Sequence, residues 1–340
     1  MSEILKYLKI QNNHKNFFDF ISGLEKSFFK VENITIKQTL FICGMPRSGT
    51  TFLTHLIESS KNFSSFKYQD LPFYTVPILW SYFSGLFYGN KKKIKRPHGD
   101  ELLIDKLSPD AFEELIWKQL IPNYEKDGYW KYIDKNDSTI KFSKLEAFIK
   151  KVIYIYKNKN YLSKSNNNIF RINYLLNSFP NSKVIIVIRN PIDTAISLTR
   201  VHLKFLKIHK TDNKFSEELK YLGHLEFGYY RKLFKLEKKI KTNTSQIKMY
   251  LEKCEELNAF IIKKYLHEIK DKKIAIINYD NLSKFENLTE LFKDIDIKEF
   301  DLMQKYFNKN FKKNKRFHIN NNNYDEYFKS FRILDKFSLI

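Results

Sequence analysis

Cysteine is scarce in this sequence, which has only Cys43 and Cys254 among its 340 residues. Two cysteines cannot build a disulfide framework, and no C-x-x-C pair indicates a metal site. No apolar run reaches the length of about 18 residues that a membrane-spanning helix needs. The N-terminal segment also lacks the apolar stretch of a signal peptide, because charges interrupt it every few positions. These features predict a soluble protein that stays in a reducing cytoplasm.

Acidic residues are the second deficit, since 38 Asp and Glu stand against 60 Lys and Arg and leave a net charge of +22. Such a charge is typical of proteins that bind nucleic acids or anionic membranes. Here, however, the lysines are spread over the whole chain together with abundant Asn, Ile, Phe and Tyr, and no helix-turn-helix, zinc-finger or RNP motif is present. We interpret the charge as a general bias of composition. No nucleic-acid partner is expected, although salt-dependent binding to DNA or RNA would support that alternative.

Short apolar runs alternate with helical patterns along most of the chain. Runs at 39–43, 184–188 and 274–278 are continuously apolar, which is typical of strands buried on both faces, and helical stretches separate them. This alternation predicts an α/β fold of three layers, in which helices flank a central, mostly parallel sheet. The fold is like that of the P-loop proteins.

The same pattern suggests three regions. We expect a helical lead-in over 1–36, a main domain over 37–300 and a C-terminal tail over 301–340 that covers a bound ligand. Within the main domain, residues 71–160 are rich in aromatics and are interpreted as an insertion over the ligand-binding edge of the sheet. The polar stretch 308–327 is expected to be a loop.

A glycine-containing loop follows the first predicted strand, with the sequence Gly44-Met45-Pro46-Arg47-Ser48-Gly49-Thr50-Thr51. A strand, loop and helix in this order surround an anion with backbone N–H groups and the helix dipole. A nucleotide-hydrolysing P-loop would have Lys after its second glycine. This loop has Thr50 there, and its cation, Arg47, lies inside the loop. The loop therefore predicts a phosphate site, while a P-loop kinase or NTPase remains only an alternative.

The second predicted strand ends in a cation, Arg189, and Ser197 lies in the helix that follows. P-loop NTPases normally place an acidic residue at this position to hold a metal ion. Arginine in its place indicates a site for a phosphate, which Arg189 and Ser197 can contact together. No metal cofactor is expected.

These two motifs resemble those of the sulfotransferases that use PAPS (3'-phosphoadenosine 5'-phosphosulfate), especially bacterial members related to the tyrosylprotein and carbohydrate enzymes. The pattern P-[K/R]-S-G-T-T is matched over 46–51, and R-x-P-x-D-x-x-x-S over 189–197. The resemblance implies that the 3'-phosphate lies on Arg189 and Ser197. It implies that the 5'-phosphosulfate lies on five loop residues, which are Arg47, Ser48, Gly49, Thr50 and Thr51.

Two later segments resemble the family less closely. The Y-[E/D]-D-L pattern is matched from Tyr279 onward except at Asn281, and implies that Tyr279 contacts the adenine. The family's C-terminal R-K-G loop is absent. Its role in closing over the donor falls to four basic residues, which are Lys312, Lys313, Lys315 and Arg316.

The resemblance implies transfer of a sulfuryl group from PAPS to a hydroxyl or amine, with release of PAP (adenosine 3',5'-bisphosphate). The acceptor is left open among carbohydrates, lipid-linked glycans, small molecules and peptides, and the oligomeric state is left open too. Such transfer needs cations, for which we choose Arg47 and Lys164. Lys164 resembles a K-[S/D]-P strand end in which Asn166 replaces the proline. A PAPS-binding protein without catalytic activity is a further alternative.

A base must also take the proton of the acceptor. Asp70 is the first candidate, because the resemblance to the tyrosylprotein and many bacterial members implies a carboxylate base at about this distance after the loop. The stretch 65–73 is predicted to be the second strand and would carry Asp70 close to Arg47 and Lys164. His98 is the second candidate, because the resemblance to the family's cytosolic animal branch implies a histidine base and an Arg-Pro-His-Gly turn exposes the ring. Weaker candidates are Asp100, Glu113 and Glu114.

Overall fold

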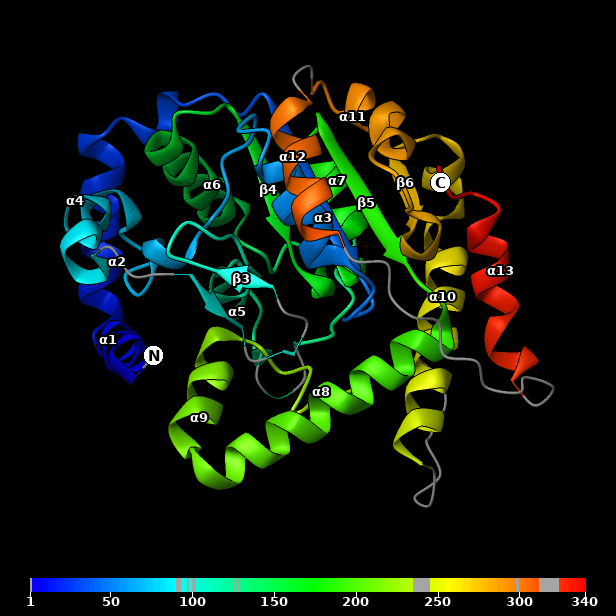
Figure 1. Cartoon of the computed structure of the whole chain (residues 1–340). Coiled ribbons are helices and arrows are strands. Elements are labelled where there is room, and N and C mark those ends of the chain that lie inside the picture. Colours follow the sequence, from blue (N-terminus) through cyan, green and yellow to red (C-terminus); the bar gives the residue numbers. More distant parts are fainter. Residues whose placement is uncertain are drawn as a thin grey trace.

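The structure is a computed structural model, and it describes residues 2–89, 93–96, 98–99, 102–124, 126, 129–234, 245–297, 300–311 and 324–340. A four-stranded parallel sheet with the order β4-β1-β5-β6 lies at the centre of the molecule (Figure 1). Its strands are β1 (Gln38–Gly44), β4 (Asn160–Lys164), β5 (Ser182–Ile188) and β6 (Ile274–Asn278). Because all four strands run in the same direction, their carboxyl ends meet at one edge of the sheet.

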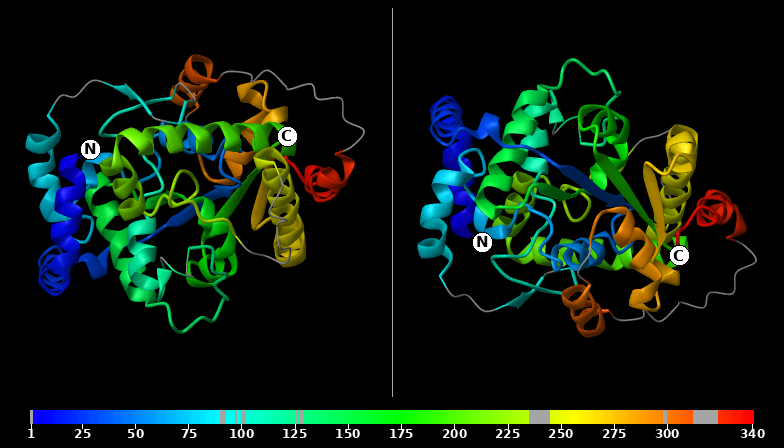
Figure 2. Two further views of the ribbon diagram at one scale, coloured as in Figure 1. Left: turned by 90° about the horizontal axis from the view of Figure 1, so that it is seen from below. Right: turned by 90° about the horizontal axis from the view of Figure 1, so that it is seen from above.

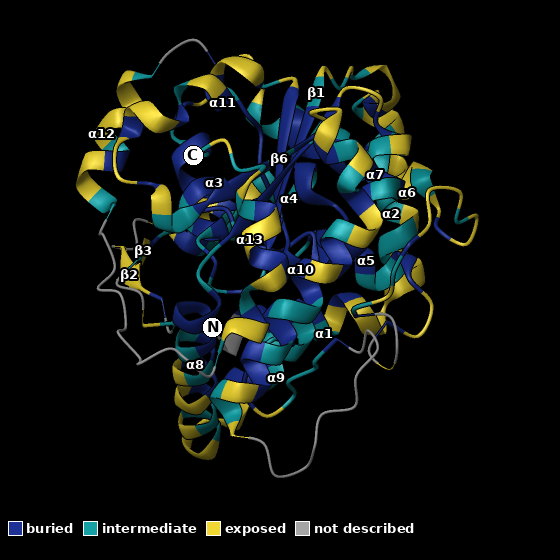
Figure 3. Ribbon diagram, turned by 90° about the vertical axis from the view of Figure 1, so that its right-hand side faces the viewer, coloured by how far each residue is buried: buried dark blue, intermediate teal, exposed yellow. Residues whose placement is uncertain are grey.

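Both faces of the sheet are buried (Figure 3). In β1, Leu40 and Ile42 pack on one face, and Phe41 and Cys43 pack on the other. The first face is covered by α3 (Thr50–Glu58), α11 (Thr289–Asp294) and α12 (Asp301–Asn310). The second face is covered by α5 (Glu114–Leu120), α6 (Phe142–Tyr156), α7 (Ile172–Ser178) and α10 (Gln246–Lys270). The predicted three-layer α/β fold is confirmed.

The remaining elements surround these layers (Figure 2). Helices α1 (Ser2–Asn13), α2 (Lys15–Phe28) and α4 (Pro77–Tyr88) lie together at one edge, and α13 (Lys329–Asp335) lies at the opposite edge. Helices α8 (Pro191–Thr211) and α9 (Asn213–Leu222) follow β5, and β2 (Ile94–Lys95) pairs with β3 (Leu103–Ile104). Among the described residues, no helix is long and apolar enough to cross a membrane.

The predicted second strand over 65–73 is wrong. Ser64 and Lys67 form isolated bridges, with Tyr161 and Pro109 respectively, and a 3₁₀ helix, Tyr68–Asp70, follows. The cause is local, because the Asp70 carboxylate accepts the backbone N–H of Lys67 at 2.7 Å and closes a turn. The strand beside β1 is instead β4, which the sequence shows weakly because only two of its five residues are apolar.

The tail also differs from the predicted loop over 308–327. Helix α12 continues to Asn310, because Met303 and Phe307 are spaced four apart and both are buried. A 3₁₀ helix, Asp325–Phe328, leads into α13, and the N–H of Leu339 donates to the carbonyl of Ile276 in β6 at 3.0 Å. The four basic residues expected to close over the donor lie outside the described residues.

Candidate functional site

The glycine loop connects the carboxyl end of β1 to α3. Gly49 precedes the helix with φ of 105°, and a Cβ atom there would lie 2.3 Å from the ring of Tyr279. Only glycine combines this conformation with such a close approach. The first N–H groups of α3 have no acceptor within the helix, so they and the helix dipole attract an anion.

Ser48, Thr50 and Thr51 place three hydroxyl groups at the N-terminus of α3. Ser48 is 1% exposed, and its Oγ has no hydrogen-bond partner among the described residues. Thr50 Oγ1 lies 3.4 Å from Asn166 Oδ1, and Thr51 Oγ1 lies 3.5 Å from Arg96 Nη1. A buried hydroxyl without a partner at a helix N-terminus is suited to an oxygen of a bound anion.

The second motif lies against this loop. Arg189 follows β5, and α8 then begins because Pro191 occupies its first turn and Asn190 caps the N–H groups of the next two residues. Arg47 Nε donates to Ser197 Oγ at 3.1 Å. Arg189 Nη1 donates to the carbonyl of Arg47, also at 3.1 Å. Two motifs separated by more than 130 residues in sequence, 46–51 and 189–197, are therefore in direct contact.

The end of β6 completes this group. The Tyr279 ring covers Gly49, and the Arg189 guanidinium carbon lies 5.7 Å from the centre of that ring. The Asp280 carboxylate lies 3.7 Å from Arg189 Nε, which is buried and has no hydrogen-bond partner among the described residues. The same carboxylate accepts the N–H of Asn190. Arg189 is thus held in place, with hydrogen-bonding capacity left for an anion.

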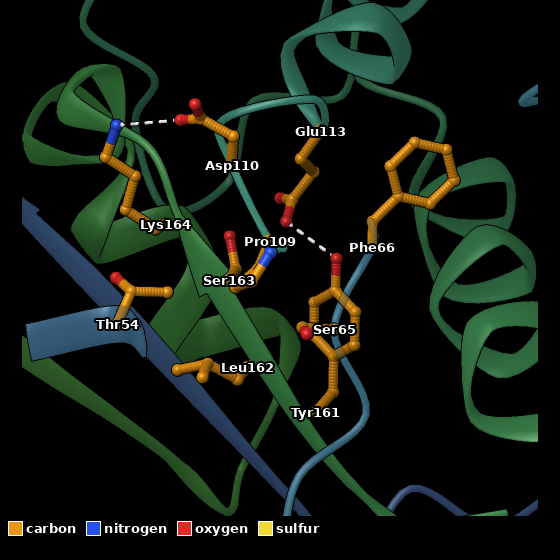
Figure 4. Close-up of a pocket in the computed structure, with 10 residues that line it drawn as sticks. All are labelled: Thr54, Ser65, Phe66, Pro109, Asp110, Glu113, Tyr161, Leu162, Ser163 and Lys164. Carbon is orange, nitrogen blue, oxygen red and sulfur yellow. Dashed lines mark hydrogen bonds and ion pairs between the residues drawn. The ribbon is translucent and has the colours of Figure 1, made fainter. Parts of the chain in front are cut away.

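Lys164 ends β4, which is separated from β6 by two strands of the same sheet, and its ammonium lies 3.3 Å from the Asp110 carboxylate (Figure 4). Arg96 Nη1 lies 3.9 Å from Asp110 as well as near Thr51, so the ion pair is connected to the loop. Burial by itself raises the pKa of Asp110, but Lys164, His224, Arg96 and His98 together hold it well below the usual carboxyl range. Asp110 therefore stays ionised.

Asp110 was not among the residues predicted from the sequence. It belongs to a polar turn, and no motif distinguishes it there from the neighbouring carboxylates. Buried His55 of α3 holds this turn in place, because its Nε2 donates to the carbonyl of Pro109 at 3.1 Å. Burial lowers the pKa of His55 to about 4. A cavity of about 10 Å³ lies behind the ion pair, with Thr54 and Ser65 among its lining residues.

His98 lies on the α8 side of this cluster. Its ring packs edge-on against Phe205 of α8 and against Phe227, with centroid distances of 5.2 and 6.1 Å. Arg96, two residues before His98 in sequence, lies 3.9 Å from the Asp110 carboxylate. The second candidate base thus belongs to the same short segment as an arginine that contacts Asp110.

Asp70, the first candidate base, lies elsewhere. Its carboxylate accepts from the Tyr156 hydroxyl at 2.8 Å as well as from the Lys67 amide. The Lys67 ammonium pairs with Glu58, the last residue of α3. Because α3 has nine residues, Glu58 lies about 12 Å along the helix from the loop. The expected position of Asp70 at a strand end beside Arg47 and Lys164 is thus corrected.

The weaker candidates Glu113 and Glu114 have structural partners. Both are 2% exposed. Glu113 accepts hydrogen bonds from Trp117 and Tyr161, and Glu114 forms a two-pronged ion pair with Arg171 at 2.7 and 3.0 Å. They hold α5 against the sheet, whereas Asp100 lies outside the described residues. Among the described residues, no group of His, Cys, Asp or Glu is arranged to hold a metal ion.

Comparison with known proteins agrees with this geometry. A family model described as "Sulfotransferase family" matches residues 39–246. The solved structure of sulfotransferase STF9 from Mycobacterium avium is similar with a TM-score of 0.53 and 13% identity, over 93% of this chain and 78% of that one. Sulfotransferase STF1 from Mycobacterium tuberculosis H37Rv has a TM-score of 0.48 and 12% identity, over 92% and 79%. No curated protein matches the chain.

Proposed function

This chain belongs to the sulfotransferase family, and we propose that it transfers a sulfuryl group from PAPS to a hydroxyl or amine of an acceptor, with release of PAP. The observation that carries this proposal is the contact of the two donor motifs, in which Arg47 bonds to Ser197 and Arg189 bonds to the Arg47 carbonyl. A site for a molecule with phosphates at both its 3' and 5' positions needs such a pair of anion sites side by side.

The residues of the loop fit the 5'-phosphosulfate. Ser48 Oγ, the Thr50 and Thr51 hydroxyls and the N-terminal amides of α3 would bind its oxygens, while Gly49 leaves room for Tyr279 beside the adenine. Arg189 and Ser197 would bind the 3'-phosphate, because Arg189 Nε is buried and has capacity for another acceptor.

In the transfer, the acceptor oxygen or nitrogen forms a bond to sulfur while the bond between sulfur and the bridging oxygen of the 5'-phosphate breaks. Negative charge then grows on the leaving phosphate, and cations held in place stabilise it without reorganisation. Arg47 and Lys164 would provide this charge. Asp110 keeps Lys164 in position at the end of β4.

The acceptor also loses a proton. We assign this role to His98 rather than to Asp70. His98 lies two residues after Arg96, which contacts Asp110, whereas Asp70 is engaged by Tyr156 near the far end of α3. His98 as base would take the proton directly from the acceptor, and Asp110 would stabilise the resulting imidazolium.

The cellular setting that we propose is the bacterial cytoplasm. Cys43 and Cys254 are both free and buried, which suits a reducing compartment, and the similar solved sulfotransferase STF9 is mycobacterial. We propose a small-molecule, carbohydrate or lipid acceptor and no nucleic-acid partner.

The function is tested by incubating the protein with PAPS and a panel of phenols, sugars and amines, and by measuring PAP. We expect PAP to form with at least one acceptor class. His98→Gln should lower turnover roughly 10²- to 10⁴-fold, as loss of a general base does, and Asp70→Asn should not. Loss of turnover in Asp70→Asn with an active His98→Gln would return the base to Asp70. If no acceptor yields PAP although PAP itself binds, the chain is a PAPS-binding protein without catalysis.

A further inference from the structure

The outer sides of α2 and α4 carry a concentration of exposed apolar side chains. Seven of the sixteen large apolar side chains exposed in the described part of the chain lie on these two helices, and each of the seven is at least 51% exposed. They are Phe17, Phe20, Leu24 and Phe28 of α2, and Tyr82, Phe83 and Leu86 of α4. Helix α4 has no charged residue at all. An exposed aromatic surface of this kind indicates a partner.

The two rows of side chains lie on adjacent helices. The Glu25 carboxylate of α2 accepts the N–H of Leu79 in the first turn of α4 at 2.7 Å. The ring of Phe29, just after α2, stacks on Tyr82 with a centroid distance of 6.4 Å. Figures 1 and 2 show α2 and α4 side by side at the edge of the molecule opposite α13. We call the seven side chains together the α2–α4 face.

Lysines surround this face. Lys15 and Lys30 at the two ends of α2 are exposed. Lys157 is also exposed, and its Nζ lies 4.1 Å from the centre of the Tyr154 ring. Tyr154 in turn packs on Phe29. Lys106 Nζ donates to the carbonyl of Gly89 at the end of α4.

The acidic side chains near the face are balanced by other lysines. Asp19 of α2 pairs with Lys144, and Glu32, which follows α2, pairs with Lys26. The lysines at the ends of the helices therefore leave a net positive rim around an apolar centre.

We propose that the α2–α4 face docks the protein on an anionic lipid bilayer. Apolar and aromatic side chains with lysines beside them are the pattern of surfaces that lie in the membrane interface, where rings enter the headgroup region and lysines meet acidic lipids. A second copy of the chain fits less well. A symmetric pair would place two rims of the same sign against each other, in a molecule whose net charge is +22.

The test is co-sedimentation of the full chain with vesicles of phosphatidylcholine, alone or mixed with phosphatidylglycerol. The key variant replaces three residues of the face, Phe20, Phe28 and Leu86, by Ser. Their side chains are 64%, 80% and 88% exposed, so the fold does not depend on them. Its matched control replaces Leu302, Ile333 and Leu339 by Ser. These three apolar residues lie outside the face, and their side chains are 43–47% exposed. Two charge-reversal variants are also compared. Lys30→Glu changes a lysine beside the face, and its control Lys305→Glu changes an exposed lysine of α12.

We expect binding to the anionic vesicles, reduced more than about tenfold by the serine variant of the face and left unchanged by its control. Lys30→Glu should weaken binding more than Lys305→Glu. Equal binding by both serine variants would mean unspecific adsorption of a basic protein and would overturn the proposal. So would failure of the wild type to bind. A dimer in light scattering that only the serine variant of the face abolishes, without vesicle binding, would identify the face as a contact between copies.

Discussion

The shape of the proposed donor site depends on Gly49, which has no Cβ atom. A methyl group at this position would lie 2.3 Å from the Tyr279 ring, and the backbone has a φ of 105° that alanine adopts poorly. Tyr279 would have to leave the loop, and the loop would lose its shape.

We expect Gly49→Ala to lower the free energy of unfolding by about 1 to 2 kcal/mol from the backbone alone, and to weaken PAP binding because Tyr279 is displaced. Denaturant unfolding and calorimetry measure the two effects. The matched control is Gly85→Ala within α4, where a Cβ meets nothing within 4 Å. That change should raise stability by about 0.5 to 1 kcal/mol. Unchanged PAP binding in Gly49→Ala would show that the close contact with Tyr279 is unimportant.

Asp70 leads to a prediction about pH. Burial raises its pKa to about 7, although hydrogen bonds from the Lys67 amide and Tyr156 oppose this. The folded protein thus holds the proton more tightly than the unfolded chain, so the contribution of Asp70 to stability is full below about pH 4 and is lost as the pH rises through about 7. Asp70→Asn should therefore be more stable than the wild type above pH 7, by on the order of a few kcal/mol, and the advantage should vanish near pH 4. Thermal unfolding across this pH range measures the difference, and a constant difference at all pH values would contradict the burial of an ionisable Asp70.

At the scale of single residues, the sequence predicted which loops meet better than it predicted where the candidate base Asp70 lies. Arg47, Arg189 and Tyr279 lie in contact because each follows a strand of one parallel sheet, and that arrangement is visible in the order of strands and loops. Asp110 was missed and Asp70 misplaced because turns without periodicity decide both positions. The distances within such turns depend on hydrogen bonds that the sequence does not reveal.

Among the secondary-structure elements, the N-terminal helices depend on one buried ion pair. Lys151 of α6 lies 2.7 Å from Glu25 of α2, and both side chains are at most 4% exposed. Lys151 also donates to the carbonyls of Ser22 and Thr75. The pair therefore holds α2 and the segment before α4 against α6.

We expect Lys151→Met to cost about 3 to 5 kcal/mol of stability, since it leaves the Glu25 carboxylate buried without its counter-charge. The same two helices provide the control in the exposed pair Lys144–Asp19, whose side chains are 44% and 39% exposed. Lys144→Met should cost less than about 1 kcal/mol. Chemical denaturation compares the two variants, and limited proteolysis shows whether α1 and α2 detach first. Similar costs for both variants would mean that the buried pair adds nothing beyond a surface contact.

The elements themselves were largely predictable. Three strands of the sheet and the helical stretches that separate them follow from continuous apolar runs and helical spacing, with boundaries within a few residues. The strand expected over 65–73 failed because Asp70 closes a turn there, and β4 was obscured by its polar residues. Helix α12 was missed because polar residues surround the few apolar positions that bury it.

For the whole molecule, the central claim is that the ends of β1, β5 and β6 form a site for a nucleotide with a 3'-phosphate. The net charge of +22 attracts any polyanion, so binding of a nucleotide alone does not test this claim. The comparison must vary the 3'-phosphate and one arginine while leaving the overall charge nearly constant.

The most direct measurement is thermal unfolding with PAP or ADP, without magnesium, for the wild type, Arg189→Ala and the control Arg200→Ala, which removes an exposed arginine of α8. Ligands that bind the folded state raise the unfolding temperature. We expect PAP to stabilise the wild type and Arg200→Ala strongly and ADP to do so much less. Arg189→Ala should lose about 1.5 to 3 kcal/mol of PAP binding, the scale of a hydrogen bond to a charged group, and change little with ADP. Equal shifts for PAP and ADP in the wild type, or an equal loss of both ligands in Arg189→Ala, would contradict a 3'-phosphate site at Arg189.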